Sequence, residues 1–322
     1  MNEKLIVPVP ASVAAWYLVP ATMEADRARG IALSRAGESI GRLIEYAECD
    51  LKVEVSSTVS SGENFRRPGW VSGQHRVSDR HLVSFRASAR TGIPALHEDV
   101  ARALAAEFAS ELKVPAIADA GAGQWISADE ARASLHAKED GNLRLSDWVR
   151  VAAVPDGENR TVSLETVGLR RYGLPELRAA DVPSWFGDGW SVALTGLAWR
   201  LRAEFLETVF AATPAGELPL RTQAPATFGV PEQIRLSADD VASAYCLRGV
   251  SDPLGNTIGL RRDQEASGTF LTVRPPRDWD WGPEAFLESV ADGPLRPVLK
   301  AARVFDDLVT GNTDLAEFAL RF

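Results

Sequence analysis

The stretch His81-Leu-Val-Ser-Phe-Arg-Ala-Ser88 alternates apolar and polar side chains, and Leu51-Lys-Val-Glu-Val-Ser56 does the same. Alternation with a period of two predicts half-buried β-strands. Helical spacing of apolar residues occurs on both sides of this pair of strands, and short apolar runs lie beyond it. These flanking helices and runs cover residues 23–47, 96–112, 14–19 and 114–119. The sequence therefore predicts the order β-α-β-β-α-β for the first third of the chain.

This order predicts an α+β fold with a ferredoxin-like N-terminal layer in residues 1–140. Residues 141–322 are expected to form a second α+β domain made of one or two hairpin-plus-helix units, because each of two hairpin patterns precedes a helical pattern. The hairpin patterns pair 148–154 with 161–167, and 257–262 with 269–274. A stretch rich in Pro, Thr and Gly marks a candidate sub-boundary near 218–230.

The charge and hydropathy of the chain exclude several classes of function. The 322 residues carry a net charge of −9, so the chain as a whole has little attraction for the phosphates of a nucleic acid. No apolar run is long enough to span a membrane, and the first residues lack the pattern of a signal peptide. We therefore expect a cytoplasmic bacterial protein that binds neither nucleic acid nor membrane.

Metal and cofactor sites are not expected either. The chain has two Cys, Cys49 and Cys246, and four scattered His, which is too few for a disulfide framework or a zinc site with the usual ligands. The glycines at 121 and 123 form a turn before a predicted strand, whereas a phosphate-binding loop precedes a helix. No catalytic motif of known spacing is present.

The most concentrated polar cluster is Arg170-Arg171-Tyr172 with Glu176. Paired arginines can bind a carboxylate or phosphate in a bidentate manner, and a desolvated Glu176 can act as an acid or base. The alternative interpretation is structural, and we favour it. In that case the glycines form a turn and Tyr172 packs against neighbouring residues. Pro175 begins a short helix, and the carboxylate of Glu176 suits the positive end of that helix.

Two loops combine tryptophan with acidic residues and are candidates for partner binding. Exposed Trp rings are frequent anchors in protein interfaces. In a strand, the alternation of 278–281 would place both Trp on one face and both Asp on the other. The alternative is that the rings cover helix ends, because Trp is on average highly buried. The candidate residues are Asp278, Trp279, Asp280 and Trp281 in one loop, and Trp185 and Trp190 in the other.

The segment 101–125, with its Ala-rich helix, strand and Gly turn, precedes the hairpin and the sequence Thr166-Val-Gly-Leu-Arg-Arg-Tyr-Gly-Leu-Pro-Glu-Leu177. Together these segments resemble a group of uncharacterised bacterial proteins built from domains of unknown function. Their signature T-x-G-L-x-x-[FY]-G-x-P-E-L matches 166–177. The resemblance covers roughly residues 80–180. It implies no particular activity, although some similar proteins look like immunity or accessory factors.

Three further features of the sequence give specific expectations: one glycine, one histidine at a helix start, and one group of His and Asp. Gly173 separates the hairpin from Pro175, so we expect it in a backbone conformation that a β-carbon disfavours. His97, beside acidic residues at a helix start, is expected on the surface. His75, Asp79 and His81 lie close enough in the sequence to suggest hydrolase chemistry, but a solvated loop is the favoured interpretation because no nucleophile motif accompanies them.

These observations favour a protein that acts by binding another protein without catalysis, as an immunity or accessory factor would. The acidic charge suggests a basic partner. The alternative is a small-ligand-binding protein or enzyme centred on Arg170, Arg171, Tyr172 and Glu176. Convergence of these four side chains in a concave pocket would favour the alternative. An exposed Trp patch would favour protein binding.

Overall fold

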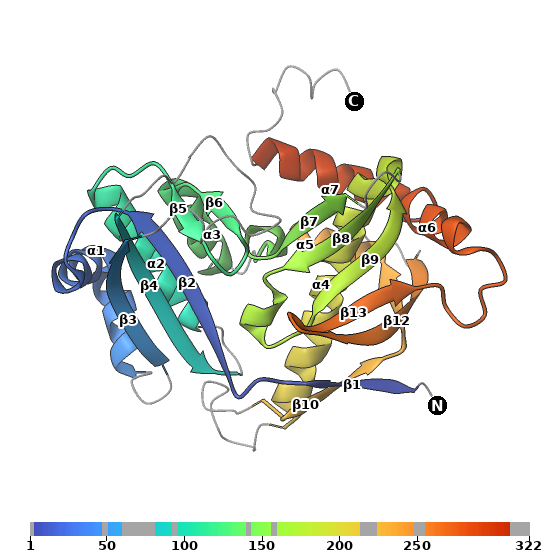
Figure 1. Ribbon diagram of the computed structural model, residues 1–322, viewed down its shortest axis with the longest axis horizontal. Coiled ribbons are helices and arrows are strands. Elements are labelled where there is room, and N and C mark those ends of the chain that lie inside the picture. The colour runs from blue at the N-terminus through green and yellow to red at the C-terminus, as the bar shows by residue number, and fades with distance from the viewer. Residues whose placement is uncertain are drawn as a thin grey trace.

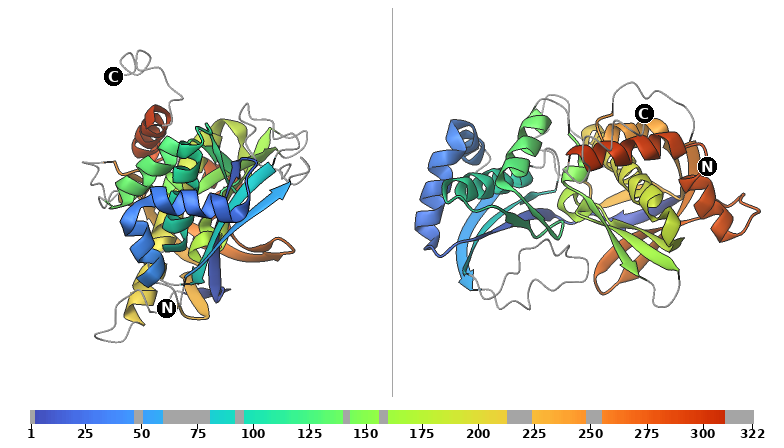
Figure 2. Two further views of the ribbon diagram at one scale, coloured as in Figure 1. Left: turned by 90° about the vertical axis from the view of Figure 1, so that its left-hand side faces the viewer. Right: turned by 90° about the horizontal axis from the view of Figure 1, so that it is seen from above.

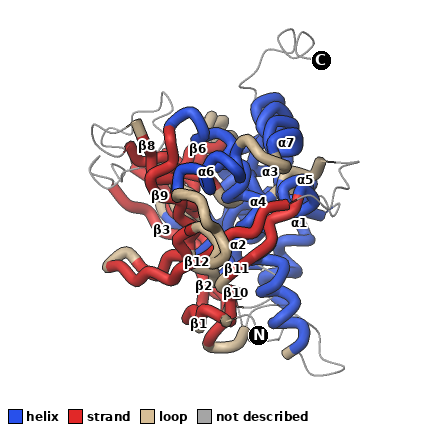
Figure 3. Tube along the Cα trace, turned by 90° about the vertical axis from the view of Figure 1, so that its right-hand side faces the viewer, coloured by secondary structure: helices blue, strands red, loops and turns tan. Residues whose placement is uncertain are grey.

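The computed structural model describes residues 3–46, 51–59, 81–91, 96–139, 143–155, 160–212, 224–247 and 255–309. Its two larger sheets lie side by side (Figure 1). Seen from above and from the side, the main helices cover the same side of both sheets (Figures 2 and 3). We refer to the sheet made by residues 12–126 with its helices as the first unit, and to the other sheet with its helices as the second unit.

The first unit is an antiparallel five-stranded sheet in the order β3-β4-β2-β5-β6. Without β6, this is the strand order of a ferredoxin-like fold, so the predicted layer is confirmed. The strands are β2 (Ser12–Pro20), β3 (Leu51–Val59), β4 (His81–Arg90), β5 (Ile117–Asp119) and β6 (Gln124–Ile126). The helices are α1 (Ala25–Tyr46), α2 (Leu96–Glu111) and α3 (Ala128–Glu139).

Helix α2 packs on the sheet of the first unit through its apolar stripe. Leu104 and Phe108 are buried against Tyr17 and Phe85 from β2 and β4. The rings of Phe85 and Phe108 lie 5.2 Å apart in a tilted arrangement. Many of the other α2 positions are alanine, which lets the helix approach its neighbours closely, and almost the whole helix is buried. Side chains that point away from the sheet of the first unit are therefore buried as well.

The second unit is a six-stranded sheet in the order β11-β12-β13-β9-β8-β7. Both predicted hairpins are confirmed, as β7 with β8 and as β12 with β13. The strands are β7 (Arg150–Pro155), β8 (Thr161–Val167), β9 (Glu176–Pro183), β11 (Gln233–Ser237), β12 (Gly255–Glu265) and β13 (Gly268–Arg274). The helices are α4 (Gly187–Ala211), α5 (Ala238–Ala244), α6 (Pro283–Ala291) and α7 (Arg296–Val309).

The two hairpins belong to one sheet because β9 pairs in parallel with β13. This pairing overturns the predicted helix at Pro175, since the residues that follow it form β9. The helical turn precedes Pro175 instead, as the 3₁₀-helix η3 (Leu169–Tyr172). Two further 3₁₀-helices, η2 (Leu145–Asp147) and η4 (Ser184–Phe186), lie before β7 and before α4.

The N-terminal strand β1 (Lys4–Pro8) lies with the second unit. It pairs with β10 (Thr227–Pro231), and Val7 and Val9 are buried in the core of the second unit. The chain therefore begins in the second unit, enters the first at β2 and returns after α3. The predicted domain limits near 140 and 218–230 remain predictions. No helix among the described residues is both long and apolar enough to cross a membrane.

Candidate functional site

Glu176, one of the four residues of the predicted polar cluster, stabilises the adjacent 3₁₀-helix η3. Its buried carboxylate accepts hydrogen bonds from the backbone N–H groups of Gly168, Leu169 and Arg170, at 3.0 to 3.2 Å, and from the Thr166 hydroxyl at 2.8 Å. Burial raises the pKa of Glu176, and the four donors oppose that shift. The carboxylate thus satisfies orphan donors at the start of η3, which is a structural role.

Arg170 and Tyr172 have separate neighbours. The guanidinium carbon of Arg170 lies 5.4 Å from the centre of the Phe270 ring, and Tyr172 lies beside Arg202 at 5.2 Å. Burial raises the pKa of Tyr172 to about 12. The four residues of the predicted cluster therefore do not converge on one pocket.

Gly173 ends η3 with φ +79°, in the left-handed region, as predicted. A β-carbon there would overlap Cγ2 of Thr91, at the end of β4. The close approach of Gly173 to Thr91 brings η3 against the first unit.

Arg171 is the residue of the cluster that the first unit surrounds. Its guanidinium forms a bidentate pair with Asp119, at 2.7 and 3.2 Å, and Nη1 also lies 3.1 Å from Glu98 Oε2. All three side chains are almost completely buried. A β-carbon on Gly121 would overlap Nη2 of Arg171, so any larger residue there would displace the guanidinium. We call this group of Arg171, Asp119, Glu98, Tyr17 and Arg102 the junction cluster.

Arg102 completes the junction cluster from α2. Its guanidinium donates to the Tyr17 hydroxyl at 3.0 Å, to Ser134 Oγ at 2.7 Å and to the Asp147 carbonyl at 2.9 Å, and it lies 3.3 Å from Asp119 Oδ2. Sequence reasoning missed the cluster because its members lie far apart in the chain. Cation pairing holds the pKa of Asp119 below its usual value, against the effect of burial.

His97 also lies at this contact, where surface exposure was expected. Its side chain is 2% exposed, and Nε2 lies 3.0 Å from the carbonyl oxygen of Arg171. The expectation was wrong because α2 packs against η3 as well as against its own sheet. His75, Asp79 and Cys49 lie outside the described residues, and Cys246 is partly buried. In the described part of the chain, no group of three or more His, Cys, Asp or Glu could hold a metal ion.

The tryptophans of the 278–284 loop occupy different environments. Trp279 is partly buried and packs edge-on against Phe286, with ring centres 5.7 Å apart, whereas Trp281 is 73% exposed. Residues 275–282 form no strand, so the expected division into a Trp face and an Asp face is wrong. Asp278 and Asp280 are exposed.

Trp185 and Trp190 differ in the same way. Trp190 is fully buried and donates from Nε1 to the Leu287 carbonyl at 2.9 Å, so it belongs to the core and is not available to a partner. Trp185 is 62% exposed, and its ring packs against Phe186 with centres 6.0 Å apart. Of the six partner-binding candidates, Trp185 lines a groove among the described residues.

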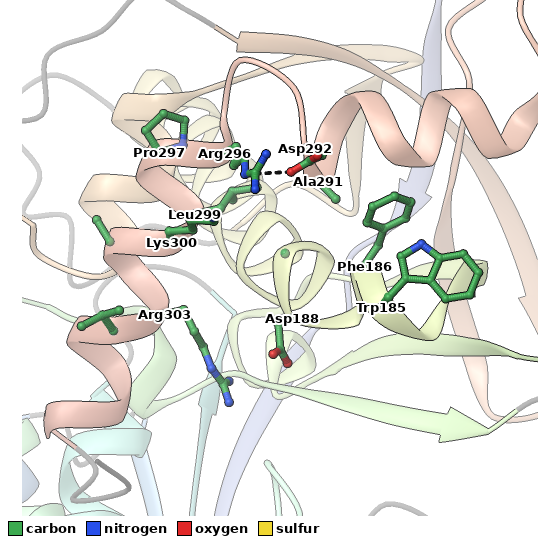
Figure 4. A pocket seen from close by; sticks show the side chains of 13 residues that line it. Trp185, Phe186, Asp188, Ala291, Asp292, Arg296, Pro297, Leu299, Lys300 and Arg303 are labelled. Carbon is green, nitrogen blue, oxygen red and sulfur yellow. Dashed lines mark ion pairs between the residues drawn. The ribbon is translucent and has the colours of Figure 1, made fainter. Parts of the chain in front are cut away.

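This groove lies between α7 and the segment formed by η4 and the start of α4, and it encloses about 750 Å³. Figure 4 shows Trp185 and Phe186 on one side and α7 on the other, with Asp188 between them. Apolar atoms of Phe186, Ala291 and Leu299 contribute to its wall. The groove is the candidate functional site.

The side of the groove formed by α7 is basic. Arg296, Lys300 and Arg303 all line it, and their spacing places them on one face of the helix. Asp292 pairs with Arg296 at 2.8 Å, and Asp188 adds a second carboxylate. Sequence reasoning identified the apolar pattern of this helix but missed its basic face, although the spacing of the three cations was a visible signal.

Comparison of the chain with family models, curated proteins and solved structures finds no match. The resemblance over residues 80–180 therefore stays a prediction. The functional argument rests on the geometry of the groove.

Proposed function

We propose that this protein acts by binding another protein, and that the groove between η4 and α7 is the docking site. The observation that carries the proposal is Trp185, which keeps 62% of its surface exposed at the edge of a groove of about 750 Å³. An exposed Trp beside a partly apolar concave surface has the properties of an interface anchor.

The charge of the groove supports an acidic partner. Three cations and two carboxylates line it, and one carboxylate is already paired with Arg296. The whole chain carries −9, which alone would favour a basic partner. Charges more than about 8 Å away are largely screened at physiological ionic strength, so the side chains of the groove dominate once contact is made.

We therefore propose an acidic partner segment, in which one apolar side chain packs against Trp185 and Phe186 and a neighbouring carboxylate approaches Lys300. The proposal concerns a binding role without a catalytic step. The alternative centred on the 170–176 cluster has less support, because Glu176 and Arg171 are engaged in the interior. A cytoplasmic location and an immunity or accessory role remain predictions.

A peptide-display selection against the purified chain tests the proposal. We expect the selected peptides to combine an aromatic or large aliphatic residue with Asp or Glu. Their dissociation constants should rise at least about tenfold in Trp185→Ala, the effect expected when an anchoring Trp is truncated. Lys300→Glu should weaken binding and reduce its dependence on salt.

Trp281→Ala is the matched control, because Trp281 is at least as exposed but does not line the groove. It should leave peptide affinity unchanged. Equal affinities for the wild type and Trp185→Ala, or selected peptides without acidic residues, would contradict the proposal. A selection that yields no binding peptide would also count against docking of a linear segment.

A further inference from the structure

The contact between the two units places two carboxylates on one buried guanidinium. Arg171 pairs with both oxygens of Asp119, at 2.7 and 3.2 Å, so Glu98 is the second anion on the same group, at 3.1 Å. Glu98 is 1% exposed, and its Oε1 atom has no hydrogen-bond partner. An ionised carboxylate in this position has donors at Oε2 alone, so the lost hydration of Oε1 is not compensated by a hydrogen bond.

The groups around Glu98 come from four elements. Tyr17 on β2 donates to Oε2 at 3.0 Å, and Asp119 on β5 brings a like charge close to it. From η3, Arg171 attracts the ionised form, and the hydroxyl of Tyr172 lies near enough to interact electrostatically. Arg102 lies on the same helix as Glu98 and donates to Tyr17, Ser134 and Asp147, and its positive charge also favours the ionised form of Glu98. His97, also on α2, contacts the Arg171 carbonyl.

We propose that Glu98 makes the contact between the two units sensitive to pH near neutrality. When Glu98 is protonated, η3 stays seated against the first unit. When Glu98 is ionised, the contact is weakened, because the new charge stays buried beside Asp119 with one oxygen unpaired. When η3 and its Arg171 move away from the other members of the junction cluster, water reaches Glu98 and stabilises its ionised form.

The direction of the effect follows from proton linkage. Burial raises the pKa of Glu98 from 4.5 to about 7 in the closed contact, and exposure to water would return it towards 4.5. The closed state therefore binds more protons between these two values, so its advantage is complete below pH 4.5 and is lost as pH rises towards 7. With these two pKa values, the opening constant increases about 20-fold between pH 5.5 and pH 7.5.

Hydrogen–deuterium exchange of the whole chain measures this opening. Amides of residues 171–174, which bond within and after η3, should exchange about 20-fold faster at pH 7.5 than at pH 5.5, after correction for the intrinsic pH dependence of exchange. Amides that exchange through local fluctuations without exposing Glu98, such as those at the frayed ends of α4, should show no comparable change. Their behaviour separates the opening that exposes Glu98 from other local fluctuations.

Glu98→Gln tests the assignment to this side chain. The amide oxygen can accept from Tyr17 and Arg171, but the side chain cannot ionise, so the ratio between the two pH values should fall to about 1. Glu111→Gln lies on the same helix at an exposed position and should behave as the wild type. A 20-fold ratio that persists in Glu98→Gln would overturn the proposal.

A titration of the wild-type chain keeps the proposal testable if Glu98→Gln does not fold. The carboxyl carbon shift of each Glu side chain can be followed by NMR from pH 4 to pH 8.5. One Glu should titrate with a midpoint near 7. If every Glu titrates below pH 5.5, Glu98 is ionised in the closed contact and the proposal is wrong.

Discussion

The guanidinium carbon of Arg102 lies 3.6 Å from the centre of the Trp148 ring, and both side chains are almost completely buried. Arg102 belongs to α2 of the first unit, whereas Trp148 follows η2 at the entrance to the second. The guanidinium lies over the face of the indole ring, and its N–H groups donate to Tyr17, Ser134 and the Asp147 carbonyl. Protein groups thus replace the water around this cation.

We expect Arg102→Met to destabilise the fold by about 3–5 kcal/mol, because removal of one member of a buried ionic network leaves its partners uncompensated. Urea unfolding followed by circular dichroism measures the change. Arg132→Met is the control, since Arg132 is 34% exposed and its ion pairs are at the surface. The control should stay within about 1 kcal/mol of the wild type. Similar losses in both variants would show that the buried network has no special importance.

Gly173→Ala should destabilise the fold by about 1–3 kcal/mol, because the new β-carbon meets Thr91 and residue 173 has φ +79°. The double variant with Thr91→Ser separates the two causes. Serine keeps the hydroxyl that bonds the Pro10 carbonyl but lacks the overlapping methyl group. In the double variant we expect a destabilisation of about 1 kcal/mol to remain, which is the cost of the left-handed backbone conformation for alanine. Thermal melts of the single and double variants measure these losses. Identical melting temperatures for the wild type and Gly173→Ala would show that residue 173 tolerates a β-carbon without strain.

Trp279→Ala and Trp281→Ala should differ sharply in stability. Trp279 packs on Phe286, so Trp279→Ala should lower the free energy of unfolding by about 2–4 kcal/mol. Trp281 is 73% exposed and should stay within about 0.5 kcal/mol of the wild type. The free energies of unfolding from denaturant titration give the comparison. Equal costs would mean that the two rings share one environment.

Ser237→Ala should cost about 1 kcal/mol, the usual loss for an N-cap. Ser237 accepts from the backbone N–H of Asp240 at 3.2 Å, and the Asp240 carboxylate accepts from the N–H of Ser237 at 2.9 Å. Ser237→Asn supplies another capping side chain and should recover most of the loss. Equilibrium unfolding of both variants tests this, and an unaltered Ser237→Ala protein would show that the reciprocal cap adds nothing.

Local patterns predicted most of the elements, because the information for a hairpin or an amphipathic helix lies within a few residues. The strand after Pro175 was missed although one of its partners, β8, ends about nine residues before it; its other partner, β13, lies about ninety residues further along the chain. Nothing near Pro175 encodes that pairing, whereas the local Pro-Glu pair favours a helix start. The capping box at Ser237 spans only four residues, so this kind of signal is local in the sequence.

The candidate site was predicted only in part. Trp185 was identified from its loop, but a groove requires a second wall, and α7 follows α4 by more than eighty residues. The junction cluster shows the same limit more strongly. Tyr17, Glu98 and Asp119 stand out in no local pattern of the sequence, and only the packing of the two units places them with Arg171 in a common low-dielectric environment. Arg171 was singled out for its neighbours in the sequence, whereas its partners lie in the other unit.

The two crossings of the chain between the units have a mechanical consequence. One crossing leads from β1 to β2, near the lower edge of Figure 1, and the other lies between α3 and η2 in the chain order. Bodies joined at one point can swivel in every direction, whereas bodies joined at two points turn mainly about the line through both. Any separation of η3 from the other members of the junction cluster is thereby limited mainly to rotation about this one axis. Severing the chain between β1 and β2 would release the other rotations without removing a side chain.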